Sequence, residues 1–422
     1  MKRFLLLTLL LAPAVATAGE DPALAKARKL LRKNILIDGH NDLPWAVRKW
    51  EKAPRDVDAY DIRKPAPGQT DLQRLKDGGV GGQFWSVYIP AEDPAAGFAR
   101  VQLEQIDIAL RIIAKYPDRF GLATTADDVE RQFKKGRIAS LLGIEGGYAL
   151  ESSLGALRAY YDLGVRYMTL THSVNLDWAD AAGDEPRHGG LTRFGEEVVH
   201  EMNRLGMLVD LSHTTPETMQ DALRVAEAPV IFSHSSARGV CDHVRNVPDE
   251  VLRQLPKNGG IVMVTFVPAF VSQEVWDAER PYWEEYKRRI VGIQDVAERE
   301  RIYKEIMDPV TRPKATISQV ADHVEHVRKV AGVDHVGLGG DFDGSDRMPE
   351  GLEDVSKYPS LFAELIRRGW KDEELKKLAG KNLLRVMREA EADARRLQKT
   401  RPPSIATLES LDGVPPAPAQ VP

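Results

Sequence analysis

Short apolar runs alternate with amphipathic segments along most of the 422-residue chain. The runs are rich in β-branched and other apolar residues and are bounded by glycine or polar residues, a pattern that predicts β-strands. Most segments between them carry apolar residues at a spacing of about 3.6 positions, which predicts helices. The predicted strands span residues 35–42, 81–89, 139–147, 166–173, 208–214, 230–236, 261–266 and 335–344. The clearest helices span residues 101–116, 153–164, 191–206 and 317–332.

The order of these elements predicts the fold class. Alternating strands and helices, with strands that are apolar on both faces, are typical of a parallel α/β sheet covered by helices. Eight such repeats fit a (β/α)8 barrel, the TIM-barrel fold. Because these barrels run long as one unit, we predict a single catalytic domain at residues 19–397.

Two segments interrupt this regular order. Residues 46–80 form a long, charged, proline-containing excursion after the first strand, and residues 267–315 are highly charged with interleaved Trp and Tyr. The second segment predicts helices inserted after the seventh strand. Since a loop that follows a barrel strand lies on the functional face, this insertion is expected to cover the site or to contact a partner subunit. A solvated pair of helices is an equally consistent interpretation.

The two ends of the chain differ in composition from the rest. Residues 1–18 have a positive start, an apolar core and small residues before the cleavage point, which predicts a signal peptide and a periplasmic or secreted protein. The apolar core is too short to span a bilayer. Residues 398–422 are rich in proline and small residues without a long apolar stretch, so we expect a disordered tail and neither a membrane span nor a lipid anchor.

Charge and cysteine content exclude some classes of partner and of metal site. The formal net charge of −5 becomes about −7 once Lys2 and Arg3 leave with the signal peptide, so we expect no nucleic-acid partner. The single cysteine, Cys241, excludes an internal disulfide framework and a zinc–thiolate cluster. Any metal must then be held by histidine and carboxylate side chains.

Residue types that bind metals recur where the predicted strands end, which is where a (β/α)8 barrel carries its chemistry. A lone histidine at a strand end is more often structural, but here six of the eight strands end with residues of this kind. These residues are His40, Asp42, Glu145, His172, His213, His234, Asp341 and Asp343. Their clustering predicts a metal centre at the carboxyl end of the barrel.

The first strand carries a pair of such residues. His40 and Asp42 are two positions apart, so both side chains point toward the barrel axis and can hold one face of a metal ion. The same alternation points Asp38 inward. We expect Asp38 to orient one of the ligands rather than to bind metal itself.

The remaining ligand types complete two ions. A buried carboxylate without a partner is strongly unfavourable, whereas one shared by two cations is compensated, so Glu145 is predicted to bridge. One ion is then held by His40, Asp42 and Glu145, and the other by Glu145, His213 and His234. Two divalent ions about 3.5–4 Å apart are the usual arrangement for metal-assisted hydrolysis. Nitrogen and oxygen ligands without thiolate favour two Zn²⁺ per chain, ahead of Mn²⁺ or Co²⁺.

Three further residues have the right chemistry for hydrolysis of an amide by a water that bridges two zinc ions. Asp341 is predicted to accept a proton and later donate it to the leaving amine. His172 is predicted to donate a hydrogen bond to the oxyanion. Arg245 follows the sixth strand and could pair with a substrate carboxylate, although an arginine on the surface is equally consistent with the pattern at this point.

Eight motifs together resemble the membrane dipeptidase (renal dipeptidase) family of zinc metallopeptidases. They are DGHNDLPW, GGQFWSVY, LGIEGGY, RYMTLTHSVN, PVIFSHSSA, RNVPDE, GLGGDFDG and GLEDVSKYP, in the family's order, within residues 34–390. The resemblance implies a (β/α)8 barrel, two zinc ions and hydrolysis of dipeptides with broad side-chain tolerance. It also implies that a D-residue is accepted at the C-terminal position, as in L-Xaa-D-Yaa. Some family members open dehydropeptides and β-lactams.

The resemblance also implies a role for each site residue. The family's substrate-contacting histidine falls on His172, its carboxylate-binding arginine on Arg245 and its catalytic aspartate on Asp341. The family's metal ligands fall on His40, Asp42, Glu145, His213 and His234.

The chain departs from the mammalian members of this family in three places. It lacks their hydrophobic lipid-anchor signal, and Cys241 has no second cysteine to form their intersubunit disulfide, so a homodimer would be noncovalent. After the seventh strand the mammalian members have an NFY run, whereas this chain reads VTFVPAF and then continues into the inserted segment. The fine specificity is therefore left open.

Other readings of the same residues remain. Another binuclear amidohydrolase, acting on lactams, lactones or N-acyl amino acids, would often bridge its ions with a carboxylated lysine, and no lysine ends a predicted strand. A deaminase would use one ion and leave Glu145 unexplained. In an exported binding protein the metal would be structural, and structural zinc sites are closed, whereas this ligand count leaves a position for water.

Overall fold

Eight parallel strands close into a barrel in the computed structural model, which describes residues 21–91, 97–293 and 295–413. The strands are β1 (Leu36–Asn41), β2 (Val80–Ser86), β4 (Ile138–Glu145), β5 (Val165–Thr169), β6 (Leu208–Asp210), β7 (Ile231–Phe232), β8 (Ile261–Val264) and β9 (Val336–Leu338). The ring is closed because β1 pairs with both β2 and β9, and β2 also pairs with β4. This confirms the predicted (β/α)8 fold, with all eight predicted strands in place.

A further short strand, β3 (Phe120–Leu122), lies outside the closed ring. It pairs with the first half of β4, whereas β5 pairs mainly with the second half. The sequence did not reveal β3, because three residues with a glycine in the middle carry no periodic pattern.

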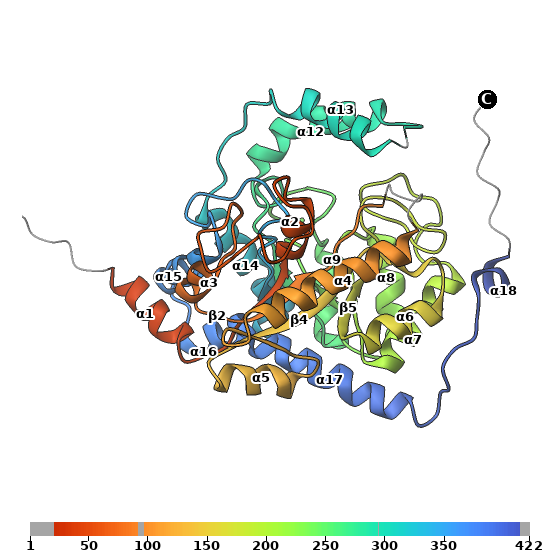
Figure 1. Cartoon of the computed structure of the whole chain (residues 1–422), viewed down its shortest axis with the longest axis horizontal. Coiled ribbons are helices and arrows are strands. Elements are labelled where there is room, and N and C mark those ends of the chain that lie inside the picture. Colours follow the sequence, from red (N-terminus) through yellow and green to blue (C-terminus); the bar gives the residue numbers. More distant parts are fainter. Residues whose placement is uncertain (1–20, 92–96, 294, 414–422) are drawn as a thin grey trace, which may run out of the picture.

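The helices predicted from apolar spacing are all present, and they surround the strands (Figure 1). They are α4 (Phe98–Lys115), α6 (Leu154–Asp162), α7 (Arg193–Leu205) and α14 (Ile317–Ala331). Further helices are α1 (Pro22–Leu31), α5 (Ala126–Lys134), α8 (Pro216–Val225), α9 (Asp249–Leu252), α10 (Leu255–Asn258), α15 (Tyr358–Arg367) and α16 (Asp372–Lys376). Local chemistry sets their ends: the Thr192 side chain accepts the backbone N–H of Gly195 at the start of α7, and Gly206 ends it in the left-handed region at φ 85°.

Apolar side chains fill the inside of the barrel. One buried cluster joins Phe84, Leu141, Tyr167 and Met263 of the strands with residues of α17 (Asn382–Leu397), among them Leu383, Val386 and Met387. The helix α17 therefore closes the amino end of the barrel. Since the interior is packed rather than open, the polar residues at the opposite end stand on a rigid floor.

Both predicted insertions lie at the carboxyl ends of the strands. The segment after β1 forms α2 (Leu43–Lys49) and α3 (Leu72–Gly78) with irregular chain between them. The segment after β8 forms α11 (Pro268–Val271), α12 (Gln273–Arg289) and α13 (Val296–Met307). In Figure 1, α12 and α13 stand apart from the ring of helices, at the top of the view. The prediction that this second segment is helical is confirmed.

The C-terminal segment departs from the prediction of disorder. A short helix, α18 (Leu408–Asp412), docks on α7: the Asp412 carboxylate accepts hydrogen bonds from the Thr192 hydroxyl at 2.6 Å and from the backbone N–H of Phe194 at 3.0 Å. Leu408 is buried. The prediction is therefore wrong for residues 398–413, because a polar, proline-rich composition does not report a tertiary docking contact of this kind.

The remaining terminal predictions lie outside the described residues. These are the signal peptide at residues 1–18 and the last part of the tail at 414–422. Among the helices that the structure does describe, none combines the length and the apolar character that crossing a membrane requires.

Candidate metal centre

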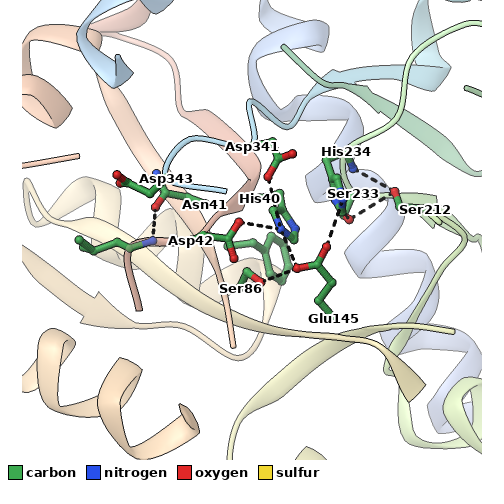
Figure 2. Close-up of polar contacts among 12 residues, drawn as sticks. His40, Asn41, Asp42, Ser86, Glu145, Ser212, Ser233, His234, Asp341 and Asp343 are labelled. Atoms are coloured by element: carbon green, nitrogen blue, oxygen red, sulfur yellow. Dashed lines mark hydrogen bonds and ion pairs between the residues drawn. The ribbon is translucent and has the colours of Figure 1, made fainter. Parts of the chain in front are cut away.

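The side chains predicted to bind metal converge at the carboxyl ends of the strands. His40 lies near the end of β1 and Glu145 is the last residue of β4. Their neighbours come from the loops that follow the strands, and Figure 2 shows His40, Asp42, Glu145, His234 and Asp341 turned toward one another. The barrel therefore brings together residues that are up to 301 positions apart in the numbering of the chain.

Glu145 lies at the middle of this cluster, and each of its oxygens faces a different set of histidines. Oε1 lies 3.0 Å from Nε2 of His213 and 3.3 Å from Nε2 of His234. Oε2 lies 3.3 Å from Nε2 of His40 and accepts a hydrogen bond from the Ser86 hydroxyl at 3.1 Å. A carboxylate with its two oxygens directed this way can bridge two cations.

The other two carboxylates lie on the His40 side. Asp42 Oδ2 is 3.2 Å from Nε2 of His40, and Asp341 Oδ1 is 3.9 Å from the same nitrogen. His172 lies on the opposite side, with Nε2 3.6 Å from Glu145 Oε1 and its ring centroid 4.2 Å from that of His213.

The structure groups these ligand atoms in three overlapping sets, each within 4.8 Å. The sets are His40, Glu145 and His234; Glu145, His172 and His213; and His40, Asp42 and Asp341. All five predicted ligands are among them, but His172 and Asp341 lie equally within reach. The division into two particular triads therefore stays a prediction.

The donor atoms fit cations better than they fit one another. Nε2 of His213 and Nε2 of His234 face each other at 2.9 Å, and buried Nε2 of His40 and Oδ1 of Asp42 have no hydrogen-bond partner among the described residues. Buried polar atoms are almost always paired, because leaving one unpaired costs about 1–3 kcal/mol. Divalent cations would satisfy these nitrogen and oxygen lone pairs together.

At His213, His234 and Glu145 the electrostatics favour the forms that bind metal. Burial holds the pKa values of His213 and His234 well below the ordinary range, so both rings are neutral at pH 7. Burial would raise the pKa of Glu145, but His40 and hydrogen bonds with the other two histidines hold it well below its usual value. Neutral imidazole and ionised carboxylate are the forms that coordinate metal ions.

Tyr167 orients the first of these histidines. Its hydroxyl lies 2.9 Å from Nδ1 of His40, which leaves Nε2 directed at the carboxylates. The tyrosine ring fits because its partner across β4 and β5 is Gly143, where a Cβ atom would meet the ring at 2.0 Å. The sequence analysis missed both residues, since Tyr167 lies in mid-strand and only the closed barrel places it beside His40.

Asp210 supports a second histidine through a serine. The Ser233 hydroxyl lies 2.6 Å from Asp210 Oδ2 and 2.8 Å from Nδ1 of His234, and the Thr169 hydroxyl donates to the same carboxylate at 2.5 Å. A hydrogen bond to the ring nitrogen that faces away from the cluster fixes the orientation and the tautomer of the His234 imidazole. Asp210 was also missed, although a carboxylate inside the apolar run LVDLSHT was a usable signal.

Two of the aspartates singled out in the sequence, Asp38 and Asp343, bind backbone N–H groups and form no hydrogen bond with the histidine rings of the cluster. Asp38 accepts the backbone N–H groups of His40 at 2.7 Å and Gly340 at 3.2 Å, so it ties the ends of β1 and β9 rather than orienting a ring. Asp343 turns away from the centre (Figure 2) and accepts the backbone N–H of Gln69 at 2.6 Å. Of the two aspartates after β9, only Asp341 faces the cluster.

The backbone is strained where two site residues are presented. His213 has φ 69° and Asp341 has φ 62°, in the left-handed region that residues with a side chain rarely adopt. Such conformations cost roughly 1–3 kcal/mol and persist where the surroundings hold them, commonly at functional sites. Here they turn the two side chains back toward the barrel axis.

Arg245 is buried beside the cluster, so the alternative of a surface arginine is wrong. Its Nη2 lies 3.4 Å from the His234 carbonyl oxygen, which accepts from it, and its guanidinium lies 5.3 Å from the ring centre of Phe270. Nε and Nη1 have no hydrogen-bond partner among the described residues, and burial lowers the Arg245 pKa to about 10. A buried guanidinium with unpaired donors can bind an anion such as a carboxylate.

A cavity of about 1200 Å³ joins these groups. Its floor includes His172, His213, Arg245 and Asp341, and its walls include residues of α11, α12 and α13. The inserted segment therefore lies over the centre, and the interpretation of a helical pair that faces only solvent is wrong.

A (β/α)8 barrel with histidine and carboxylate ligands at the carboxyl ends of its strands defines the class of metal-dependent hydrolases. The family model described as membrane dipeptidase, peptidase family M19, matches residues 24–401, so the chain belongs to this family and is a metallo-dipeptidase. The resemblance drawn from the motifs is thereby confirmed.

Individual relatives agree with this placement. The chain is 43% identical over 391 residues to dipeptidase verJ of Clonostachys rogersoniana, covering 90% of each chain. Its fold is similar to the crystal structure of the probable dipeptidase PvdM from Pseudomonas aeruginosa, with TM-score 0.77, 25% identity and coverage of 88% and 99%. It is also similar to a metallopeptidase from Rhodobacter sphaeroides liganded with a phosphinate mimic of the dipeptide L-Ala-D-Ala, with TM-score 0.68, 25% identity and coverage of 85% and 99%.

Proposed function

We propose that this enzyme uses two zinc ions to hydrolyse free dipeptides, including those of the L-Xaa-D-Yaa type. The observation that carries the proposal is the position of Arg245, whose buried guanidinium has unsatisfied donors and opens into the same cavity as the histidine–carboxylate cluster. A short substrate with a free carboxylate would satisfy Arg245 and reach the cluster at once. The similarity to a metallopeptidase that binds a mimic of L-Ala-D-Ala supports the D-residue at the second position.

The proposed ligands of the two ions are His40, Asp42, Glu145, His213 and His234. Glu145 would bridge, since its two oxygens face different histidines at 3.0–3.3 Å. Two such ions would supply a water of lowered pKa and would polarise the scissile carbonyl. Zinc is proposed first because the ligands are nitrogen and oxygen without thiolate.

Arg245 would bind the substrate by its C-terminal carboxylate. A guanidinium can pair with a carboxylate through two parallel hydrogen bonds, which fixes the orientation of the substrate as well as its position. Burial strengthens such a pair, because little water competes for the donors. The peptide bond next to the bound carboxylate is then the one presented to the cluster.

Asp341 and His172 would carry out the proton and hydrogen-bond steps. Burial together with the charges of Asp42 and Glu145 raises the pKa of Asp341 well above its ordinary value, which suits a group that accepts a proton and then passes it to the leaving amine. His172 lies on the cavity side of the cluster and would donate to the carbonyl oxygen as negative charge develops there.

We also propose that the enzyme works outside the cytoplasm, in the periplasm or after secretion, and that any homodimer is noncovalent. The first proposal rests on the signal-peptide pattern of residues 1–18. The second is supported by Cys241, which is buried and lies 3.4 Å from the Ala269 carbonyl oxygen, out of reach of a partner's cysteine.

The experiment is a substrate panel assayed on a preparation whose metal content is measured. We expect about two zinc equivalents per chain, turnover of L-Ala-L-Ala and L-Ala-D-Ala, and at least a hundredfold lower kcat/KM for L-Ala-L-Ala amide, which offers Arg245 no carboxylate. The Arg245→Met variant should show a similar, at least hundredfold, fall in kcat/KM for dipeptides and should retain both metal ions. Equal turnover of the amide, or of an N-acetylated tripeptide, would contradict the proposal.

A further inference from the structure

The inserted segment after β8 contributes an aromatic wall to the cavity that holds Arg245. Phe270 of α11 and Trp276 of α12 both pack against the His243 ring, at centroid distances of 4.3 and 4.1 Å. Phe270 also lies under the Arg245 guanidinium. The wall therefore begins beside the group that would hold the substrate carboxylate.

The wall is rigid. Trp276 is 8% exposed and His243 is 6% exposed, while Phe270 is half-buried and faces the cavity. The Nδ1 atom of His243 accepts the backbone N–H of Arg245 at 3.1 Å, which ties the wall to the arginine. A preformed apolar surface costs little conformational entropy when a ligand packs on it.

Several charged side chains around this cavity are paired with each other. Arg280 lies 2.8 Å from Asp242, and Arg312 pairs with Glu279. Arg245 lies at the floor as a buried cation whose Nε and Nη1 have no hydrogen-bond partner among the described residues, and the aromatic rings form an apolar surface beside it. The far side of the cavity continues with Trp283 and Tyr303 of the same insertion, whose rings are 5.7 Å apart.

The cavity is also larger than a small dipeptide needs. Its volume of about 1200 Å³ exceeds the roughly 300–1,000 Å³ common for pockets that enclose whole drug-sized ligands. A dipeptide of two small residues would leave the exposed part of the wall, mainly Phe270, in contact with water. A large apolar group on the substrate would cover it.

We infer that this enzyme prefers dipeptides whose C-terminal residue carries a large aromatic side chain, which packs on the wall of Phe270, His243 and Trp276. The C-terminal residue is the one concerned, because its side chain and the carboxylate bound by Arg245 share one carbon atom. The inference rests on the proposed dipeptidase function and adds its substrate class. The inserted segment is then the element that sets specificity.

The test compares dipeptides that differ only at the second position, using the zinc-loaded enzyme. From L-Ala-Gly through L-Ala-Leu to L-Ala-Phe, with both L- and D-Phe, kcat/KM is expected to rise on the order of tenfold or more, because burying an aromatic side chain is worth at least that factor. Changing the first residue from Ala to Phe should produce no such rise. Equal kcat/KM across the second-position series would overturn the inference and leave the dipeptidase function standing, whereas no cleavage of any dipeptide would remove both.

Substitutions in the inserted segment test whether its side chains cause the preference for an aromatic C-terminal residue. Phe270→Ala is expected to lower the ratio of kcat/KM for L-Ala-Phe over L-Ala-Gly by about tenfold, and Phe270→Leu should retain most of it. The matched control is Tyr282→Ala on α12, since Tyr282 is 43% exposed and lies outside the cavity lining. Zinc content and thermal unfolding are measured for each variant. An unchanged ratio in Phe270→Ala, with zinc retained, would overturn the inference.

Discussion

Single residues around the cluster divide into those that face it and those that hold them in place. His40 is directed by Tyr167, and His234 by Ser233 and Asp210, all through hydrogen bonds of 2.6–2.9 Å. These supporting groups fix which nitrogen of each ring faces the carboxylates. Substitution can separate residues that bind metal from residues that transfer protons, and Asp341 offers the most direct case.

With two metal ions bound as proposed, Asp341→Asn is expected to retain both and to lower kcat by about 10²–10⁴-fold. The amide keeps the shape of the side chain but can no longer take up a proton, so only the transfer step is removed. Elemental analysis and steady-state kinetics on the same preparation check this. A fall in metal content would instead make Asp341 a ligand, as one of the three ligand sets allows.

At the scale of elements, the site depends on how closely two strands approach. Gly143 of β4 pairs with Tyr167 of β5, and the missing side chain at 143 provides the space that the tyrosine ring occupies. The predicted strands were longer than the observed ones: residues 230–236 were predicted, and β7 comprises Ile231–Phe232. The reason is that the chain stays buried past the last ladder contact while it turns His234 toward the axis.

Gly143→Ala is expected to weaken metal binding about 10–100-fold and to cost roughly 1–3 kcal/mol of folding stability. The added methyl group would meet the Tyr167 ring at 2.0 Å and push its hydroxyl away from His40. Metal titration and urea denaturation of the variant measure the two effects. Gly155→Ala in α6 is the control, since its added Cβ meets nothing closer than 3.4 Å, and it should bind metal normally. Unchanged metal affinity in Gly143→Ala would show that the Tyr167 contact is dispensable.

At the scale of the whole molecule, His323 ties α14 to the loop after β7 and to the end of α11. It is fully buried, its Nδ1 accepts the backbone N–H of Ala237 at 3.0 Å, and its Nε2 lies 3.2 Å from the Val271 carbonyl oxygen. Burial lowers its pKa from 6.5 to about 4, so the ring is neutral in the folded protein.

Global stability is therefore expected to fall as the pH drops from 6.5 to 4. In that window the unfolded chain takes up a proton on His323 and the folded chain does not, which costs about 3 kcal/mol in total. Above pH 6.5 this contribution to the pH dependence vanishes. Urea denaturation of the metal-free protein at several pH values measures the slope, with His323→Gln as the comparison. A variant slope equal to that of the parent protein would contradict the assignment.

The sequence by itself determined the barrel and the chemical types at its mouth. Strand and helix periods are local, and ligand residues directly follow the strands, so the eight strands and the positions of His40, Glu145, His213 and His234 could be read from the chain. Burial of charged residue types at strand ends has few physical reasons other than a metal or a reaction.

Only the tertiary structure decided how these residues are held and what covers them. The contact of Tyr167 with His40 joins residues 127 positions apart, and that of Asp412 with Thr192 joins residues 220 apart. Neither Tyr167 nor Asp412 carries a local sign of its partner, because such contacts exist only once the ring of strands has closed. For the insertion after β8 the sequence left open whether it covers the site, contacts a partner or faces solvent, and only the structure shows that its residues line the cavity beside the cluster.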